Sequence, residues 1–445
     1  MDYQAYSVAN FRKIPQLCVL SEEQKKDIEV VAHILPFKVN NFVLDHLINW
    51  DNVPGDPIFT LTFPQRAMLV PRHYDEIAAL LAQGAGKPVL KQAIDRIRLA
   101  LNPHPAGQMD HNIPYVNGEP LPGVQHKYRQ TVLYFPSQGQ TCHAHCTFCF
   151  RWPQFTGMTE MRFAGREIEL LIDYVREHPE ITDILFTGGD PLVMSVKSLA
   201  ANLEPLLAAK LPNLRRIRIG TKALTYWPFR FLTDNDSTEL LDLFKRVMAS
   251  GLHLAIMAHF NHPHELASPV VRDALQRVRQ TGAEIRTQSP LMRHINDDAE
   301  VWRELWDLQV DQGCIPYYMF IARDTGAHQY FNIPLVRAWE IFRLAYQQVS
   351  GLCRTVRGPV MSTNPGKIQI MGVSEIRGEK VLALRFLQGR DPDWVQRPFF
   401  AGYDQTATWL NELKPAFGEK RFFFEDTLES TYRENINTST IFNYE

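Results

Sequence analysis

From Thr131 onward the chain alternates between short β-branched or aromatic runs and helical stretches, and this alternation constrains the fold more than any other feature. The expected strands are Thr131–Phe135, Ile184–Phe186, Ile217–Gly220, His253–Ala258, Glu284–Thr287 and Tyr317–Ile321. The helices expected with them are Arg166–Glu177, Val196–Ala209, Ser237–Ser250, Val270–Gln280, Asp298–Gln312 and Pro334–Val349. Six strand–helix units in series predict an α/β fold whose parallel sheet has right-handed crossovers.

The flanking segments have other patterns, so we expect three parts, residues 1–101, 102–350 and 351–445. Ser21 with Gln24 three residues later is typical of a capping box, and helical spacing returns from His73 to Leu101, which predicts a helical N-terminal extension. A Pro- and Gly-rich loop is expected over residues 102–123. The last part is expected to be small and rich in strands, at Val356–Met361, Lys367–Met371 and Lys380–Phe386, with Phe422-Phe423-Phe424 as a buried strand or an oligomer contact.

Three cysteines lie within eight residues directly after the first expected strand. Cys142, Cys146 and Cys149 have the spacing Cys-x3-Cys-x2-Cys. Three thiolates at this spacing can hold three irons of a [4Fe–4S] cluster and leave the fourth iron open. That iron could chelate S-adenosylmethionine and reduce it to a 5′-deoxyadenosyl radical. The alternative is a zinc site that borrows His143 or His145. A disulfide framework is disfavoured, since three cysteines cannot all pair with one another and the other three are scattered.

A set of motifs along the chain resembles the lysine 2,3-aminomutase family of radical S-adenosylmethionine enzymes. The motifs cover about residues 105–371, and they are His126-Lys127-Tyr128, the three cysteines, Arg151, Thr187-Gly188-Gly189-Asp190, His259-Phe260-Asn261-His262-Pro263, Gln288-Ser289 and Pro365-Gly366-Lys367. The resemblance implies a partial (βα)6 TIM-like barrel of the radical SAM type. It also implies that the chemistry lies at the face of the barrel where the strands end.

The resemblance assigns a role to each motif. Cys142, Cys146 and Cys149 would hold the cluster, and Thr187, Gly188, Gly189 and Asp190 would bind S-adenosylmethionine at its amino group. His259 and Gln288 would contact the adenosyl group, although polar residues satisfied at a strand end are an equal alternative. Arg151 would grip the substrate carboxylate and Lys127 the phosphate of pyridoxal 5′-phosphate. Lys367, on a Pro-Gly loop, would form the Schiff base with that cofactor.

The substrate-binding positions depart from those of lysine-specific relatives. Those relatives hold the distal ammonium of lysine with two aspartates, and the matching positions here are Arg323 and Val360. Removing an anionic pair removes most of the preference for a buried ammonium. We therefore expect a substrate other than lysine, and Arg323 would suit an acidic side chain such as that of glutamate or aspartate. Pairing of Arg323 with Asp324 is the structural alternative.

The sequence thus predicts a radical S-adenosylmethionine, pyridoxal-phosphate 2,3-aminomutase that acts on an α-amino acid, a small-molecule substrate. The alternative is a radical enzyme on the same scaffold without pyridoxal phosphate, which does a different reaction or modifies a protein side chain. With 47 Lys and Arg against 49 Asp and Glu, the formal charge of -2 does not suggest nucleic acid as a partner. No signal peptide or membrane span is expected, so we expect a cytoplasmic enzyme, a homo-oligomer that receives electrons from a flavodoxin- or ferredoxin-like reductant.

Overall fold

The computed structural model describes residues 1–102, 112–116, 118–158 and 163–431. It is an α/β structure organised by one sheet of 11 strands, in which each strand neighbours the next one in the sequence from β5 to β15. Strands β6 to β12 run parallel, whereas β5 and the last three strands pair antiparallel. The sheet strands are β5 Val124–Tyr128, β6 Thr131–Tyr134, β7 Asp183–Phe186, β8 Arg216–Thr221, β9 His253–His259, β10 Glu284–Leu291, β11 Ile315–Ile321, β12 Arg357–Ser362, β13 Gly366–Ile376, β14 Glu379–Gly389 and β15 Pro398–Gly402.

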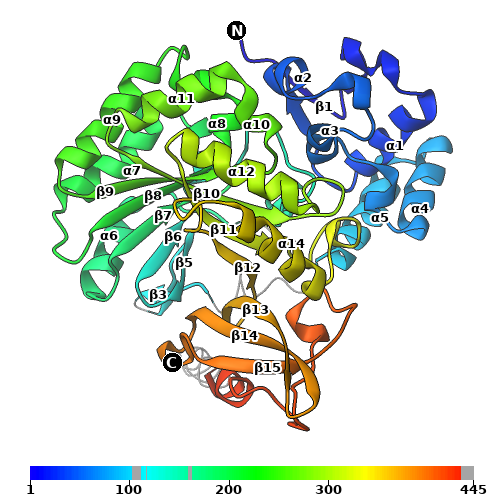
Figure 1. The fold of residues 1–445 in the computed structure, drawn as a ribbon. Coiled ribbons are helices and arrows are strands. Elements are labelled where there is room, and N and C mark those ends of the chain that lie inside the picture. Colours follow the sequence, from blue (N-terminus) through cyan, green and yellow to red (C-terminus); the bar gives the residue numbers. More distant parts are fainter. Residues whose placement is uncertain (103–111, 117, 159–162, 432–445) are drawn as a thin grey trace.

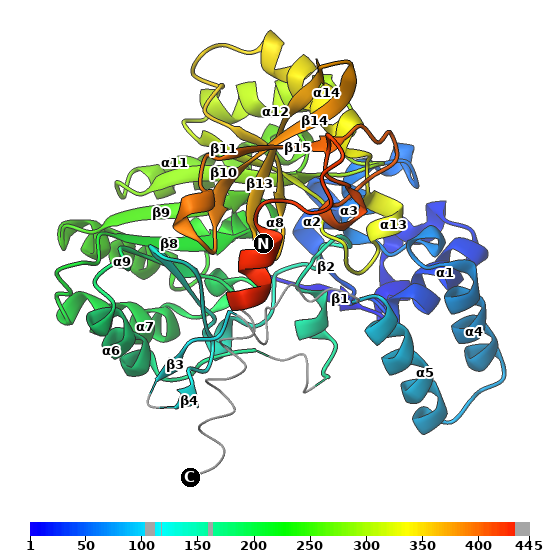
Figure 2. The ribbon, with the colours of Figure 1, turned by 90° about the horizontal axis from the view of Figure 1, so that it is seen from below.

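Helices connect the parallel strands and flank them (Figures 1 and 2). The crossover helices are α6 Ile168–Glu177, α7 Val196–Ala208, α9 Ser237–Ala249, α11 Pro269–Arg279, α12 Ala299–Asp311 and α14 Leu335–Gln348, and three one-turn helices, α8 Ala223–Tyr226, α10 His264–Ala267 and α13 His328–Phe331, follow strand ends. All six predicted strands and all six predicted helices are therefore confirmed, because their apolar residues recur at the right period and pack into one core.

The first hundred residues form a group of short helices beside the strand ends, shown in blue in Figure 1. Its elements are β1 Ala5–Ser7, α1 Glu22–Ala32, β2 Lys38–Asn40, α2 Asn41–His46, α3 Pro57–Thr62, α4 Pro71–Ala82 and α5 Lys87–Ala100. The predicted capping box is present, since Ser21 accepts from the Gln24 amide and the Gln24 side chain accepts from the Ser21 amide. The helical character predicted for this part is confirmed.

The three strands expected in the C-terminal part are confirmed as β12, β13 and β14, whereas the expectations for the loop and for the Phe422–Phe424 strand need correction. Residues 103–111 of the expected loop lie outside the described residues, and its described part contains a two-stranded hairpin, β3 Tyr115–Val116 and β4 Glu119–Pro120. The strand expected at Val356–Met361 is β12, which continues the parallel part of the main sheet beside β11. Phe422 and Phe424 are buried against Phe399 of β15, but they belong to no strand.

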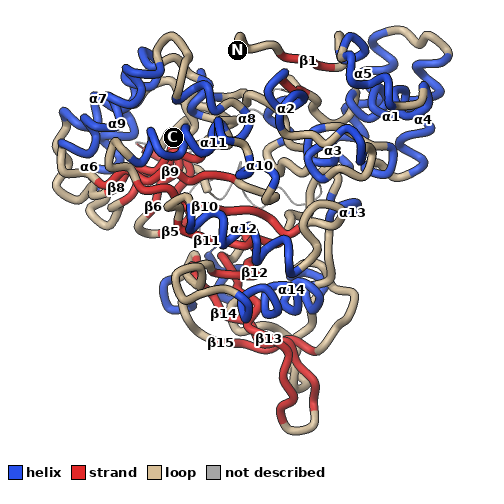
Figure 3. Tube along the Cα trace, turned by 45° about the horizontal axis from the view of Figure 1, so that its top comes forward, coloured by secondary structure: helices blue, strands red, loops and turns tan. Residues whose placement is uncertain are grey.

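The sheet curls, and this curvature defines the interior of the molecule (Figures 2 and 3). The Lys367 amine of β13 lies 5.4 Å from the ring of Tyr128 on β5 and 4.9 Å from the ring of Tyr318 on β11. The Lys127 amine of β5 donates to the carbonyl of Thr363, just past β12. Side chains from strands far apart in the sheet order therefore meet at one place. Within the part of the chain that the structure describes, no helix is long and apolar enough to cross a bilayer.

Candidate active site

The three cysteines lie together in the loop after β6. All are free thiols, and burial raises the pKa of each. Their proximity adds to this effect, since Cys146 and Cys149 also raise the pKa of Cys142. Among the described residues, no three His, Cys, Asp or Glu side chains are close enough to hold one metal ion. In a [4Fe–4S] cluster each cysteine binds a different iron, whereas the ligands of a zinc site converge on one ion.

The N-terminal segment holds the cysteine loop in place. The Lys38 amine donates to the Cys142 carbonyl over 2.8 Å, and the Asn40 amide donates to the His143 carbonyl over 3.2 Å. The Thr147 hydroxyl donates to the carbonyl of Thr60 over 2.8 Å. These contacts satisfy backbone carbonyls that burial would otherwise leave unpaired. The sequence carries no local signal for them, because the partners are about a hundred residues apart.

The Thr187–Asp190 stretch packs directly on the cysteine loop. A Cβ on Gly189 would lie 2.3 Å from the Thr141 carbonyl oxygen, and one on Gly188 would lie 2.5 Å from Nε2 of Gln140. The close approach of the Thr141 backbone therefore requires glycine at 189, and the positive φ of 149° favours glycine at 188. The resemblance had placed them at a bound ligand, and the structure gives them at least this packing role.

Asp190 is 3% exposed and its carboxylate is already engaged. It accepts from the Thr221 hydroxyl over 2.8 Å and from the backbone amides of Leu192 and Lys222. Burial raises the Asp190 pKa, and these hydrogen bonds oppose the rise. The carboxylate thus ties the end of β7 to the end of β8, next to Cys142.

His259 and Gln288 lie side by side at the ends of β9 and β10. The Gln288 side-chain amide donates to Nε2 of His259 over 2.7 Å. Burial lowers the His259 pKa to about 3, helped by the nearby Lys222 and Arg151, so the imidazole is neutral. Each of the two side chains is thus hydrogen bonded by the other at a strand end, as the structural alternative expected.

Lys222, directly after β8, was not singled out from the sequence. Its amine donates to Oδ1 of Asn261 over 2.7 Å and forms an ion pair with Glu265, whose side chain is 0% exposed. It lies close to both His259 and Cys146. Its position directly after a predicted parallel strand could have marked it as a site residue, because polar residues at the carboxyl ends of parallel strands gather at one edge of the sheet.

Replacing Lys222 by methionine is expected to lower the free energy of unfolding by roughly 3–5 kcal/mol, because it leaves a fully buried carboxylate without its cation. Lys245→Met is the matched control, since Lys245 pairs with Asp242 on the surface and should cost no more than about 1 kcal/mol. Urea unfolding of both variants measures the difference. Equal losses would show that the buried pair contributes no more than a surface pair.

Two guanidinium groups flank the ring of Phe150. The Arg151 and Arg323 guanidinium carbons lie 5.1 and 5.3 Å from its centroid. Burial lowers the Arg151 pKa to about 10, and it also lowers that of Arg323. Within the described ranges neither guanidinium forms an ion pair, and Nε of Arg323 is buried without a hydrogen-bond partner. Arg323 and Asp324 form no salt bridge among these residues, although the Asp324 carboxylate raises the Arg323 pKa and so opposes the effect of burial.

Lys367 lies inside the curled sheet, as the second residue of β13 and not in a loop as the sequence suggested. Its amine donates to Oε1 of Gln388 over 2.8 Å, beside the two tyrosine rings described above. Burial lowers the Lys367 pKa to about 7, with further lowering by Arg218 and Arg357. A lysine that is half neutral near pH 7 is chemically suited to attack an aldehyde.

Lys127 lies beside Lys367 in a region rich in positive charge. Burial lowers the Lys127 pKa well below its usual value, and Arg390, Arg323 and Lys367 lower it further. Arg390, which the sequence did not single out, donates to Oδ1 of Asn112 over 2.6 Å. Several cations gathered in one buried place fit a phosphate dianion. A buried amine with a lowered pKa beside several cations is chemically suited to a ligand that carries both an aldehyde and a phosphate.

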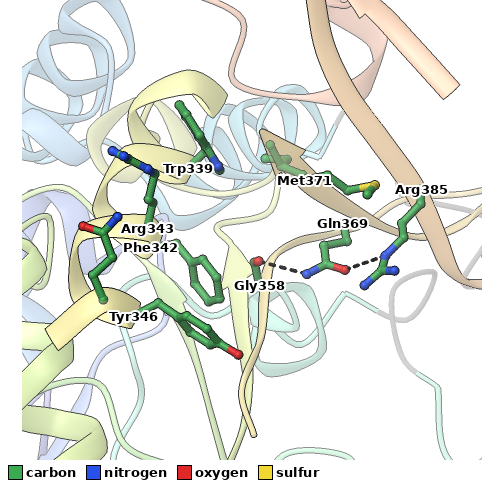
Figure 4. Close-up of a pocket in the computed structure, with 10 residues that line it drawn as sticks. Trp339, Phe342, Arg343, Tyr346, Gly358, Gln369, Met371 and Arg385 are labelled. Atoms are coloured by element: carbon green, nitrogen blue, oxygen red, sulfur yellow. Dashed lines mark hydrogen bonds between the residues drawn. The ribbon is translucent and has the colours of Figure 1, made fainter. Parts of the chain in front are cut away.

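One groove of about 480 Å³ lies apart from these residues, between α14 and strands β12 to β14 (Figure 4). Trp339, Phe342 and Tyr346 line one side of it. On the other side the Gln369 amide donates to the Gly358 carbonyl and its oxygen accepts from Arg385. It contains none of the site residues predicted from the sequence.

Three thiols at Cys-x3-Cys-x2-Cys follow the first parallel strand of the sheet and lie beside buried lysine and arginine side chains. This arrangement defines a radical S-adenosylmethionine enzyme. Comparison with known proteins specifies the family. A putative L-lysine 2,3-aminomutase of Aquifex aeolicus is 31% identical over 374 residues, which cover 84% of this chain and 86% of that protein. The chain belongs to the lysine 2,3-aminomutase family, and it is a radical S-adenosylmethionine aminomutase, an isomerase.

Other comparisons are more distant. The L-lysine 2,3-aminomutase of Clostridium subterminale is 29% identical over 266 residues, 60% of either chain, and that of Haemophilus influenzae is 29% identical over 53% of this chain and 65% of its own. Among solved structures, a radical SAM methyltransferase from Sphaerobacter thermophilus is 16% identical with a TM-score of 0.38, over 54% of this chain and 68% of that one. No protein-family model matches the chain.

Proposed function

We propose that this protein is a pyridoxal-phosphate-dependent 2,3-aminomutase, which moves the α-amino group of an amino acid to its β-carbon. The observation that carries the proposal is the buried Lys367 amine, whose pKa is lowered to about 7 beside Tyr128 and Tyr318. When bound, pyridoxal phosphate supplies a conjugated ring that can delocalise an unpaired electron while nitrogen migrates. Lys367 holds it by its amine, and the two tyrosine rings keep water away from that bond.

The remaining residues divide between the cluster, the adenosyl donor and the substrate. Cys142, Cys146 and Cys149 hold the [4Fe–4S] cluster by three irons, which leaves one iron for S-adenosylmethionine. Asp190 and the glycines before it fix the wall of that site, with His259 and Gln288 at the adenosyl group. Arg151 lies close to both Cys149 and His259, which suits a grip on the substrate carboxylate next to the adenosyl donor.

We further propose the architecture and setting that this function requires. Strands β6 to β11 with their helices form a partial (βα)6 barrel within residues 102–350, between the N-terminal extension of residues 1–101 and the C-terminal part of residues 351–445. The curl that brings β5 against β13 supports this. The enzyme works in the cytoplasm as a homo-oligomer and takes electrons from a flavodoxin- or ferredoxin-like reductant.

The test of the cofactor is covalent mapping. Purified protein is incubated with pyridoxal phosphate, reduced with borohydride and digested, and the peptides are examined by mass spectrometry. The phosphopyridoxyl group is expected on the peptide that contains Lys367 and on no other lysine at comparable yield. If the cluster is intact and Lys367 carries no label, the alternative is favoured. The protein would then be a radical enzyme on this scaffold that works without pyridoxal phosphate, and it would catalyse another reaction or modify a protein side chain.

The two unpaired guanidinium groups support an acidic substrate. Arg151 and Arg323 lie on the ring of one phenylalanine, and neither has a carboxylate partner among the described residues. Buried cations are costly unless an anion joins them, so the site is suited to two carboxylates. A dicarboxylic amino acid such as glutamate or aspartate provides one for each arginine, whereas lysine would add a further cation.

We expect turnover of glutamate or aspartate to exceed that of lysine. Arg323→Met is expected to lower kcat/KM for the acidic substrate by about 30-fold or more. This corresponds to roughly 2 kcal/mol of lost charge pairing. The exposed Arg343→Met on α14 is the control and should leave kcat/KM unchanged. Product analysis by chromatography measures each rate. A clear preference for lysine, unaffected by Arg323→Met, would rule out the acidic substrate.

A further inference from the structure

The sulfur of Cys146, in the cysteine loop, contacts the phenol of Tyr226. The Cys146 Sγ donates to the hydroxyl oxygen of Tyr226 over 3.5 Å. Tyr226 is the last residue of α8 and is 1% exposed, so its hydroxyl is fixed by packing against this sulfur. A phenol keeps its proton at neutral pH, so this hydroxyl has a hydrogen to donate.

A buried cation lies over the same ring. The Lys222 amine is 4.5 Å from the centroid of Tyr226, and its ion pair with Glu265 holds it there. A cation on the face of a phenol draws electron density from the ring and makes its hydroxyl a better hydrogen-bond donor. Lys222, Tyr226 and Cys146 thus form a short chain that begins at a fixed positive charge and ends at a cysteine sulfur.

The direction of the hydrogen bond must reverse when iron is bound. A cysteine that ligates iron is a thiolate and has no proton to donate, so the Tyr226 hydroxyl becomes the donor and the sulfur the acceptor. Hydrogen bonds to cluster sulfurs are one of the factors that set the reduction potential of iron–sulfur clusters. They stabilise the reduced cluster more than the oxidised one, because the reduced cluster carries one more negative charge.

We propose that Tyr226 is a positioning residue for electron transfer, which raises the reduction potential of the cluster by donating a hydrogen bond to the sulfur of Cys146. The inference rests on the proposed cluster at Cys142, Cys146 and Cys149. It assigns to α8 a role in deciding how readily the cluster accepts the electron that it later passes to S-adenosylmethionine. Lys222 supports this role through the ring.

The test is a redox titration of reconstituted Tyr226→Phe protein, followed by the electron paramagnetic resonance signal of the reduced cluster. Phenylalanine keeps the ring under Lys222 and removes only the hydroxyl. The midpoint potential is expected to shift to a more negative value, with the iron and sulfide content of the wild type. Tyr134→Phe is the control, because the buried Tyr134 hydroxyl has no hydrogen-bond partner in the described chain and its loss should leave the potential unchanged.

An unchanged midpoint potential in cluster-bearing Tyr226→Phe protein would overturn the inference while leaving the proposed function intact. If that variant does not hold a cluster, 3,5-difluorotyrosine at position 226 replaces it, since fluorine makes the hydroxyl a stronger donor and should shift the potential to a more positive value. A shift of zero or of the opposite sign would again overturn the inference. A wild-type protein that binds no cluster would overturn the cluster assignment and the inference together.

Discussion

The protein with Cys149→Ala is expected to lose the [4Fe–4S] cluster and all cleavage of S-adenosylmethionine while remaining folded. Cys149 is a thiol whose pKa burial raises to about 12, so the side chain removed is small and uncharged, and its loss costs little packing. The cluster needs three protein thiolates, and the other cysteines, Cys18, Cys314 and Cys353, belong to other segments of the chain. Iron and sulfide analysis after anaerobic reconstitution and the yield of 5′-deoxyadenosine measure the loss.

The control for this variant is Cys18→Ala. Cys18 is exposed and is not one of the three loop cysteines, so cluster content and S-adenosylmethionine cleavage should match those of the wild type. Full iron and sulfide in the Cys149→Ala protein would contradict the three-cysteine assignment. If the wild-type protein contained zinc and no iron or sulfide, the cysteines would form a structural zinc site instead of a cluster site.

Replacing Lys367 by alanine is expected to abolish amino-group migration and borohydride labelling, while the cluster and its cleavage of S-adenosylmethionine are retained. The reason is that this amine is the group proposed to hold pyridoxal phosphate, and it lies on β13 and donates to Gln388 rather than to a residue of the cysteine loop. Lys380→Ala on β14 is the control, since that lysine is exposed and should leave migration unchanged. Migration that persists in Lys367→Ala would exclude this lysine as the attachment site.

The same lysine predicts a pH dependence. Its pKa falls from the usual 10.5 to about 7 on folding, so between these values the unfolded chain binds more protons than the folded one. The free energy of unfolding of the apo-protein should therefore rise with pH above about 7, and Lys367→Met should lack this rise. Uptake of pyridoxal phosphate should likewise increase through pH 7 and then level off. A midpoint near the usual lysine value would show that the amine is not buried as described.

The sequence predicted the strand–helix units well because each is determined by local periodicity. The strands from Thr131 to Ile321 and the helices between them lie within a few residues of their predicted bounds. Strand β5 was missed, since Val124–Tyr128 contains three polar residues in a row, of which Gln125 is buried and His126 and Lys127 are half-buried. Strand β15 was missed because it lies in a Pro- and aromatic-rich stretch without alternation.

The sequence proposed the members of the site from motifs, but it did not predict the contacts between them. Cys142 lies close to Arg151, and Lys367 lies close to Lys127. The engagement of Asp190 by Thr221 and the approach of Arg390 to Lys127 could not be read from spacing, because they depend on which strand ends become neighbours. The same holds for Lys38, whose contact with the cysteine loop crosses 104 residues.

The pairing of β12 with β13 has a consequence for how this family can vary in length. Ser362 lies opposite Lys367 in the antiparallel register, with a turn of only three residues between the two strands, and Ile368 is the next residue along β13. Side chains alternate between the two faces of a strand. Losing one residue in this turn would put the apolar Ile368 side chain where the amine now lies, and gaining one would put Gly366 there. A change of two residues would keep Lys367 on the same face but move it two places along the strand, so only a turn of this length leaves the amine beside Tyr128 and Tyr318.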